Sequence, residues 1–511
     1  MTTSDKSSPM LITVSVMLAT IMQALDTTIA NVALPHMQGT LSATQDQISW
    51  VLTSYIVAAG IMTPATGFLS QRFGRKRLFV WSVIGFTAAS LLCGAAFTLN
   101  QIVLYRLLQG VFGAALVPLS QAILLDTFPR EQHGKAMAMW GVGVMIGPIL
   151  GPTLGGLLTE YYNWRWVFLI NLPFGILALS GILAFVPETP KDPNRPFDVM
   201  GFAFLAIAIG ALQMMLDRGE LQAWFESTEI VIEGLIAALA LYMFIAHMFT
   251  HHQPFLDRHL FIDRNFVTGL VFIFIIGIIL LATMALLPPF LQHLKGYPVV
   301  TTGYLLAPRG IGTMFSMMLV GRVMGKIDTR ALILAGLALT SLSLWQMGRF
   351  SLDVTEYMLV ESGVIQGLGL GLIFVPLSTM TFSTLAPHLR TEAAAMFSLM
   401  RNIGSSIGIS IVTALLSRNS QINHAGIGEH VSVYNPLMHA PYLPQSWSLD
   451  TTAGLLALDN EVNRQAAGIA YINDFVLMMW VTLCAAPLLL LLRKPRPTAG
   501  TPAPALHAVA D

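Results

Sequence analysis

The chain of 511 residues is 55% hydrophobic and only 11% charged, whereas soluble proteins carry about 25% charged residues. Its 27 Lys and Arg residues balance 27 Asp and Glu residues, and this zero net charge argues against nucleic acid as a partner. Both cysteines, Cys93 and Cys484, lie in apolar runs and predict no disulfide framework. The composition therefore predicts a protein embedded in lipid.

Apolar runs of roughly 20 residues, the length of a helix that crosses a bilayer, recur about fourteen times along the chain. Lys6 precedes the first run and no cleavage site follows it, so we expect a retained helix rather than a removed signal peptide. The runs predict an all-α polytopic membrane protein with helices at 10–34, 48–70, 78–98, 101–125, 136–159, 165–186, 199–216, 229–248, 266–289, 302–321, 331–348, 356–382, 392–416 and 473–492.

The first run closes with the stretch Leu25 to Pro35, which contains Asp26. An ionised carboxylate inside the hydrocarbon costs roughly 3 kcal/mol or more, so this side chain needs a partner, a proton or a function. One interpretation is a carboxyl group that gains and loses a proton during transport. The other is an aspartate at the end of the helix that faces water.

Arg106, in the fourth run, is the partner that we predict for Asp26. At ~1.5 Å per residue, Asp26 lies about 12 Å from the outer end of its helix and Arg106 about 7 Å from the end of its own. An arginine side chain can bridge the difference of about 5 Å. The alternative is that Arg106 extends outward to the membrane surface.

The loop after the second run, from Gly67 to Arg77, is rich in basic residues. Gly67 would let two helix ends approach closely, and the arginines can bind the C-terminus of a neighbouring helix by charge and hydrogen bonds. We therefore assign Gly67, Arg72, Gly74 and Arg75 to a conformational motif. The alternative is an ordinary basic loop that only orients the chain in the membrane.

Glycines repeat every four residues in the fifth run, and two prolines repeat at the same interval. This spacing places the glycines on one helix face, where backbones can pack in near contact, while the prolines loosen the backbone beside them. We expect the face to pack against the opposite half of the molecule. Its residues are Gly143, Gly147, Pro148, Gly151, Pro152 and Gly155.

The chain also repeats itself, because Leu34-Pro35 and Leu287-Pro288 close corresponding runs, and Gly67 and Gly321 open similar loops. Parallel halves around a central site are a transporter architecture. Six helices in each half account for twelve of the runs, and the remaining two, which follow a proline-rich linker, form an insert. The predicted domains are an N-terminal six-helix bundle (1–190), a linker with two inserted helices (191–250), a C-terminal six-helix bundle (251–495) and a disordered cytoplasmic tail (496–511).

Lysine and arginine concentrate in the connecting segments on one side of the predicted membrane. Cytoplasmic loops carry such an excess, so both termini are predicted to lie in the cytoplasm.

Several of these stretches resemble the major facilitator superfamily, and in particular its fourteen-helix drug:proton antiporter family of the EmrB type. They are Leu25 to Pro35, the Gly67 to Arg77 loop, Arg106 to Gly110, Gly141 to Gly156 and Trp164 to Pro173, with Leu216 to Gly219 typical of the subtype. The resemblance covers nearly the whole chain up to Pro495. It implies a multidrug efflux protein of the bacterial inner membrane that works with a periplasmic adaptor and an outer-membrane channel.

The resemblance also implies roles for particular residues. Gly141 to Gly156 matches the family's antiporter motif, Arg106 its coupling arginine and Asp26 its first-helix acid. One position departs from the family pattern, because Gln71 stands where the loop motif usually has an aspartate. The usual charge relay is therefore in doubt, and Arg72 and Arg75 would instead bind helix-end carbonyls.

A few polar residues within the runs are candidates for lining a substrate cavity: Asn31, Gln109, Arg309, Gln366 and Arg401. Arg309 and Arg401 could equally be structural, bonded to backbone carbonyls. The histidines, among them His247, His251 and His252, show no spacing that we assign to a metal, so no metal site is expected. The chain has no Gly-x-x-x-x-Gly-Lys-Ser/Thr loop, so we expect a proton gradient rather than ATP or a cofactor to supply the energy.

The segment 417–472 is too polar to cross the membrane and is predicted to be an outer loop. Its second part, from Leu455 to Ile472, has helical apolar spacing and predicts an amphipathic helix. The resemblance suggests a docking surface for the adaptor, and the alternative is a self-packed cap over the cavity mouth.

Together these features predict a proton-coupled antiporter that exports hydrophobic or amphipathic compounds by alternating access. An exporter of one endogenous metabolite or fatty acid is the alternative. A membrane enzyme would need convergent catalytic groups, and the sequence offers no such cluster.

Overall fold

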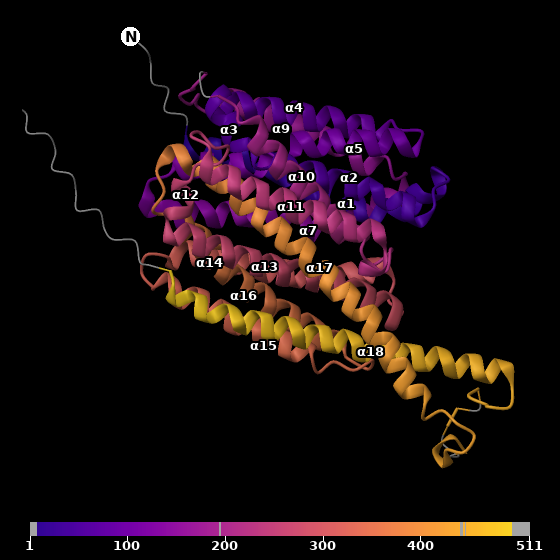
Figure 1. Cartoon of the computed structure of the whole chain (residues 1–511). Coiled ribbons are helices and arrows are strands. Elements are labelled where there is room, and N and C mark those ends of the chain that lie inside the picture. The colour runs from indigo at the N-terminus through magenta and orange to yellow at the C-terminus, as the bar shows by residue number, and fades with distance from the viewer. Residues whose placement is uncertain (1–7, 194–195, 440–442, 445, 493–511) are drawn as a thin grey trace, which may run out of the picture.

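The computed structural model describes residues 8–193, 196–439, 443–444 and 446–492, and these ranges are helical with no strand (Figure 1). The first part of the chain forms α1 (Pro9–Thr40), α2 (Gln45–Met62), α3 (Ala65–Phe73), α4 (Arg75–Gly94), α5 (Leu99–Gly113), α6 (Leu116–Thr127), α7 (His133–Tyr161), α8 (Trp166–Leu169), α9 (Asn171–Phe185), α10 (Val199–Arg218) and α11 (Thr228–Thr250). The second part forms α12 (His259–Ile262), α13 (Arg264–Pro289), α14 (Val299–Val323), α15 (Thr329–Met347), α16 (Glu356–Phe382), α17 (Arg390–Gly428) and α18 (Thr452–Ala485). Short turns lie at η1 (Arg130–Gln132), η2 (Trp224–Glu226), η3 (Phe290–Leu294), η4 (Pro387–Leu389), η5 (Pro436–His439) and η6 (Ala486–Leu490).

Side chains that accept hydrogen bonds from the first free backbone N–H groups set several helix starts. Thr44 and Thr98 form capping boxes with Gln47 and Gln101 at α2 and α5. Asp198 accepts from the Gly201 N–H at the start of α10, and Thr451 accepts from the Gly454 N–H at the start of α18. These caps place the helix boundaries where apolar runs alone leave them uncertain.

In the described part of the chain, twelve spans are long and apolar enough to cross a membrane, and α2 with α3 makes a thirteenth that is bent by 57°. α14 is 25 residues long and packs beside α7 and α16. It is not among these spans, and it carries Arg309 and Arg322 within the helix. The prediction of an all-α polytopic membrane protein is confirmed, and each predicted run corresponds to a helix or a pair of adjacent helices.

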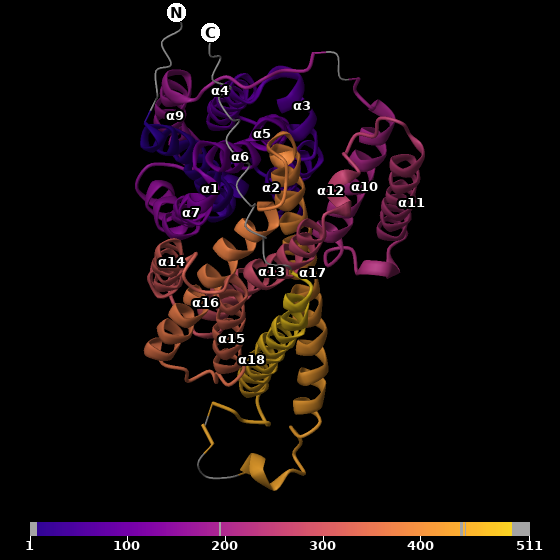
Figure 2. The same cartoon turned by 90° about the vertical axis from the view of Figure 1, so that its left-hand side faces the viewer.

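The helices pack as two groups that meet along a central interface (Figures 1 and 2). In the first group α1 packs against α7 and α9, and α5 packs against α2 and α4. In the second, α13 packs against α17, and α16 against α14 and α15. The groups meet where α7 contacts α14 and α16, and where α17 contacts α3 and α6.

The inserted helices α10 and α11 lie side by side at one edge of the molecule, where α10 contacts α2 and α17 (Figure 2). The domain limits 1–190, 191–250 and 251–495 stay a prediction, and the predicted tail 496–511 lies outside the described residues.

The segment 417–472 is not the loop that we expected, because α17 continues to Gly428 and α18 begins at Thr452. Apolar composition marks where a helix leaves the hydrocarbon, but these helices continue beyond that point. We call residues 417–428 with 452–472 the projecting hairpin, since the ends of α17 and α18 extend past the other helices (Figure 1).

The predicted helical spacing in the second part of this segment is confirmed. Leu458, Val462 and Ala466 are buried, while Leu456 on the other face of α18 is exposed. The hairpin packs on itself, because the Asn423 side-chain amide donates to the Ala466 carbonyl at 3.3 Å and His424 contacts Asp459 at 3.1 Å.

Candidate functional site

Asp26 and Arg106 form an ion pair inside the membrane-spanning helices. The Asp26 side chain has no exposed surface and that of Arg106 is 1% exposed, and Arg106 Nη1 lies 2.6 Å from Asp26 Oδ2. The predicted pairing is confirmed, and the burial of both side chains rules out an Asp26 that faces water and an Arg106 that extends to the surface. Separating such a pair would leave a buried charge uncompensated, which costs several kcal/mol.

Amide side chains complete the hydrogen bonding of the Asp26 carboxylate. Gln109 Nε2 and Asn171 Nδ2 each donate to Asp26 Oδ1 at 2.8 Å. Asn171 Nδ2 also donates to Ser90 Oγ at 2.9 Å, so this amide joins α9, α4 and α1. The carboxylate therefore accepts three charge-assisted bonds and holds α1 against α5 and α9.

The Arg106 guanidinium also contacts α2. Arg106 Nε donates to the Val51 carbonyl at 3.1 Å, and its guanidinium carbon lies 4.4 Å from the centre of the Tyr55 ring, a cation–π contact. A Cβ atom on Gly110 would lie 2.5 Å from the Tyr55 carbonyl oxygen. Gly110 thus lets α5 approach α2 closely enough for Arg106 to reach that backbone.

The glycine stripe of α7 packs against α1, which carries Asp26. A Cβ atom on Gly147 would lie 2.5 Å from the Ala24 carbonyl carbon, and Thr28 Oγ1 donates to the Gly147 carbonyl at 3.0 Å. Cβ atoms on Gly143, Gly151 and Gly155 would meet Met17, Thr28 and Ile29, all on α1. Our expectation that this face packs against the opposite half was therefore wrong, since the spacing reveals a close-packing face but not its partner.

Other residues of α7 contact the opposite half. Ile149 packs against Gly310 of α14, and Met317 of α14 lies over Gly141. Trp140 stacks on Phe374 of α16 with ring centroids 5.7 Å apart. Pro148 and Pro152, which are both half-buried, lie within α7 between these contacts and the glycine stripe. One helix therefore touches Asp26's helix on one face and the second half on the other.

At the end of the helices where α3 and α6 finish, the halves are joined by Asp126, which binds Arg75 of α4 and Arg390 of α17. Arg75 Nη2 also donates to the Pro387 carbonyl at 2.9 Å, at the start of the short turn η4. Arg75 therefore binds a carboxylate as well as a backbone carbonyl, rather than a helix-end carbonyl alone as we expected. We call Arg75, Asp126 and Arg390 the latch, and this end of the molecule the latch end.

The other residues of the predicted loop motif surround the latch. A Cβ atom on Gly67 would lie 2.8 Å from the Glu392 Cα, so this glycine permits close contact between α3 and α17. Gly74 has φ +88°, a left-handed conformation that favours glycine and turns the chain into α4. Gln71 donates to the His388 carbonyl at 3.4 Å. Arg72 lies over the Phe68 and Phe73 rings and makes no bond to a helix-end carbonyl among the described residues, contrary to our expectation.

The candidate cavity residues do not lie together. Asn31 is exposed on α1, whereas Gln109 is bound to Asp26 and Gln366 donates to Thr283 Oγ1 at 3.4 Å inside the second half. Arg309 is 6% exposed and donates to the Leu280 carbonyl at 3.3 Å. This bond fits the alternative of a structural arginine bonded to a backbone carbonyl. Arg401 is half-buried on the face of α17 near Gly277 of α13.

Sequence reasoning missed three polar residues. Asn171 lies in the Trp164 to Pro173 stretch that we had singled out, and a polar residue in that stretch was the available signal. Asp126 follows the fourth run, but nothing in the sequence links it to Arg390. Asp474 is 1% exposed within α18, and neither of its carboxyl oxygens has a hydrogen-bond partner among the described residues.

Comparisons with known proteins agree with this architecture. The family model described as Major Facilitator Superfamily matches residues 16–409. Multidrug export protein EmrB of Escherichia coli (strain K12) is 35% identical over 474 residues, which cover 90% of this chain and 93% of that protein. Fatty acid resistance protein FarB of Neisseria gonorrhoeae is 34% identical, with 96% of this chain and 97% of that protein covered.

Among solved structures, the major facilitator proton:xylose symporter XylE superposes with a TM-score of 0.63 at 12% identity, covering 94% of both chains. The human organic anion transporter MFSD10 superposes with a TM-score of 0.59 at 14% identity, covering 93% of this chain and 99% of that one. At such identities these likenesses show the fold alone. The family match and the curated relatives together establish that the chain belongs to the major facilitator superfamily of membrane transporters, with EmrB multidrug export proteins among its relatives.

Proposed function

We propose that this transporter is a proton-coupled antiporter that exports hydrophobic or amphipathic drugs and toxic compounds by alternating access. The observation that carries the proposal is the buried Asp26–Arg106 pair with its two amide donors. A charged network in this position is expensive, and in transporters such residues serve as proton relays or substrate sites. The proton gradient supplies the energy, and no cofactor is required.

Protonation of Asp26 would neutralise the carboxylate and remove its attraction for Arg106. Arg106 would keep its charge and its contacts with Val51 and Tyr55 on α2, while α1 would lose its strongest tie to α5. A proton accepted from outside and released inside would thus weaken and restore this tie once in each cycle.

A continuous path of contacts leads from Asp26 to the second half. α1 packs against the glycine stripe of α7, and the other face of α7 packs against α14. A shift of α1 therefore moves a helix that lies on the interface between the halves. An outward-facing transporter must be closed at its cytoplasmic end. The latch joins the halves at one end of this structure and would provide that closure.

The class of substrate rests on the relatives. EmrB is named as a multidrug export protein and FarB as a fatty acid resistance protein, and both are similar to this chain over most of its length. A fatty acid exporter is therefore the second candidate function, and the intramembrane cations Arg309 and Arg401 suit an anionic head group if they come to face the substrate.

The location and partners extend the same proposal. The bacterial relatives and the distribution of basic residues support a place in the bacterial inner membrane, with both termini in the cytoplasm. The projecting hairpin would then extend into the periplasm. There it would dock a periplasmic adaptor that leads to an outer-membrane channel.

Transport by inverted vesicles that are acidified inside tests the function. The wild-type protein should accumulate a lipophilic substrate in response to the pH difference, and Asp26→Asn should not. Asp474→Asn is the matched control, since Asp474 is also a buried intramembrane carboxyl but has no hydrogen-bond or cation partner among the described residues. Accumulation by Asp26→Asn at the wild-type rate would refute the assignment of Asp26.

A further inference from the structure

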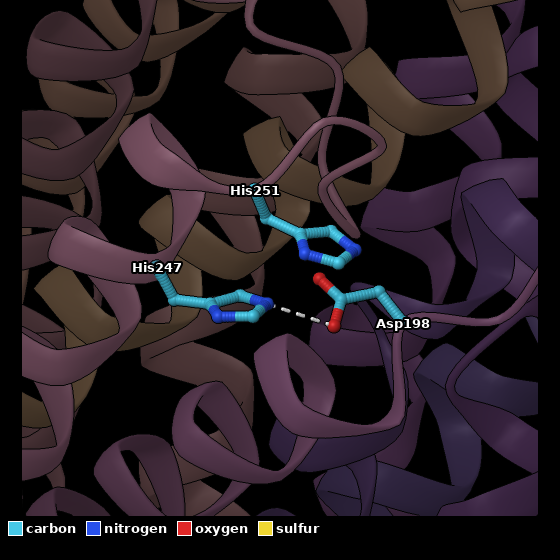
Figure 3. Close-up of side chains that lie close together, drawn as sticks. All are labelled: Asp198, His247 and His251. Carbon is cyan, nitrogen blue, oxygen red and sulfur yellow. Dashed lines mark hydrogen bonds and ion pairs between the residues drawn. The ribbon is translucent and has the colours of Figure 1, made fainter.

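Asp198, His247 and His251 lie together at the latch end, where α10 begins and α11 ends (Figure 3). His247 Nε2 lies 2.9 Å from Asp198 Oδ1, and the two imidazole rings stack with centroids 4.7 Å apart. One possible ligand atom from each of the three residues lies within 4.8 Å of the others. Among the described residues, no other group of three His, Cys, Asp or Glu side chains converges in this way.

We propose that Asp198, His247 and His251 bind a divalent transition metal ion, with Zn²⁺ as the ion that best fits the ligands. Two imidazoles and one carboxylate are a ligand set that zinc accepts in protein sites. Ligand atoms around a tetrahedral zinc ion lie roughly 3.4 Å apart, given bonds of about 2.0–2.2 Å. The measured distance from His247 Nε2 to Asp198 Oδ1 is 2.9 Å, and the possible ligand atoms all lie within 4.8 Å of one another, so rotations of the side chains would suffice.

The carboxylate is held in place before any ion arrives. Asp198 Oδ1 accepts the Gly201 N–H at 2.8 Å, and Asp198 Oδ2 accepts the Phe255 N–H at 3.0 Å. Phe197 packs edge-on against Phe255 with centroids 5.9 Å apart, which fixes the chain on either side of these bonds. Such supporting contacts around ligands hold a metal site in its binding geometry.

His251 is the flexible member of the set. It follows the last residue of α11 and is exposed, with its carbonyl bound by Arg258. His247 lies one helical turn earlier, so both imidazoles project from the same face of α11 (Figure 3). Binding would therefore require a small movement of one exposed side chain rather than of the backbone.

A cavity of about 240 Å³ opens beside the three residues and is lined by Pro196, Phe197, Asp198, His251, His252 and Gln253. It gives an ion access to the Asp198 carboxylate. A water molecule in this cavity would supply the fourth ligand that zinc coordination requires.

An ion in this site would tie the segment before α10 to the segment after α11. The segment after α11 also contacts α17, because the Asp257 N–H donates to Glu392 Oε1. The site therefore lies on the link between the inserted helices and the latch. The proposal concerns binding alone and does not depend on proton coupling by Asp26.

Binding of Zn²⁺ and Co²⁺ to the full-length protein, purified without a histidine tag, tests the proposal. We expect about one tightly bound zinc ion per chain, displaced by chelators, and a Co²⁺ absorption spectrum of tetrahedral type. His251→Ala and Asp198→Asn should weaken binding roughly tenfold or more. Asn can still cap α10, so the second variant keeps the helix start.

His424→Ala is the matched control, because His424 contacts Asp459 at 3.1 Å but has no third ligand beside it in the described structure. It should leave zinc affinity unchanged. Equal affinity in the wild-type protein and His251→Ala would overturn the proposal, as would an equal loss of affinity in His251→Ala and His424→Ala. Asp198 and His247 would then form only a hydrogen-bonded pair.

Discussion

Asp126, at the end of α6, binds Arg390, at the start of α17, and this ion pair joins the two halves of the transporter. The same carboxylate binds Arg75 of α4, so one acid neutralises two arginines from opposite sides of the interface. The loop motif of the family usually places an acid at the position of Gln71. In this chain a carboxylate from a different helix lies between the arginines instead.

Asp126→Asn should weaken the closed latch and shift the protein toward conformations that are open at the latch end. The lost bonds are charge-assisted but partly exposed, so we expect roughly a tenfold change in the ratio of conformations. Spin labels at Arg130 and Lys326, in a Cys484→Ser background, would report longer distances in the variant.

Glu188→Gln is the matched control for the latch, because Glu188 and Arg77 form an exposed pair at 4.0 Å. Exposed pairs contribute little to stability, so its distance distribution should match that of the parent protein. Identical distributions in Asp126→Asn and Glu188→Gln would contradict a latch that holds the halves together.

Gly147→Ala should destabilise the packing of α1 on α7. The new methyl group would lie 2.5 Å from the Ala24 carbonyl carbon, and overpacking of this kind costs about 1–3 kcal/mol. Thermal unfolding in detergent should therefore begin at a lower temperature, and transport should fall because Asp26 lies two residues from Ala24.

Gly156→Ala provides the comparison on the same helix, since a Cβ atom there would have no neighbour within 4 Å. That variant should unfold and transport like the parent protein. Equal behaviour of the two alanine variants would show that the contact between α1 and α7 is not tight.

Removal of the projecting hairpin distinguishes its two candidate functions, which are docking of a partner and capping of the cavity. The Asn423 side chain reaches the Ala466 carbonyl, so deletion of 425–465 joins two points that already lie close together. We expect transport in isolated vesicles to persist and drug resistance in intact cells to disappear, because only cells need the adaptor. Loss of vesicle transport in a normally inserted variant would favour the cap, and unchanged resistance would exclude both functions.

Substrate charge provides another prediction. Asp26 offsets Arg106, whereas Arg309 and Arg401 have no carboxylate within ion-pair distance in the described structure. A cavity lined by these two arginines would therefore be biased toward positive charge. Burial of a permanent cation near such charge is costly. Overexpression should therefore protect cells from acidic uncouplers and fatty acids more than from quaternary ammonium dyes. Protection limited to the dyes would contradict the expectation.

The sequence predicted the helices because the bilayer imposes a length of about 20 apolar residues on each of them. It predicted the Asp26–Arg106 pair because depth in the membrane can be counted along a helix. It did not reveal Asn171 as a partner of Asp26, because that contact depends on the rotation of α9. The sequence also located the glycine face of α7, but the choice of α1 as its neighbour depends on how the bundle packs.

Other misses have related physical causes. The ends of α17 and α18 lie beyond the hydrocarbon, where polar composition no longer distinguishes a helix from a loop. Asp126 and Arg390 are far apart in the chain, and only the packing of α6 on α17 brings them together. His247 and His251 have the spacing of one helical turn, but the third member of their cluster, Asp198, comes from another helix.

The most direct test of the central claim is the release of protons when substrate binds to purified protein in weakly buffered detergent solution. The pH is chosen low enough that Asp26 is protonated in the substrate-free protein, and the substrate must not titrate at that pH. The wild-type protein should then release protons as substrate binds, because Asp26 gives up its proton and pairs with Arg106 again. Asp26→Asn should bind substrate without releasing protons. Proton release from Asp26→Asn equal to that of the wild-type protein would contradict the account.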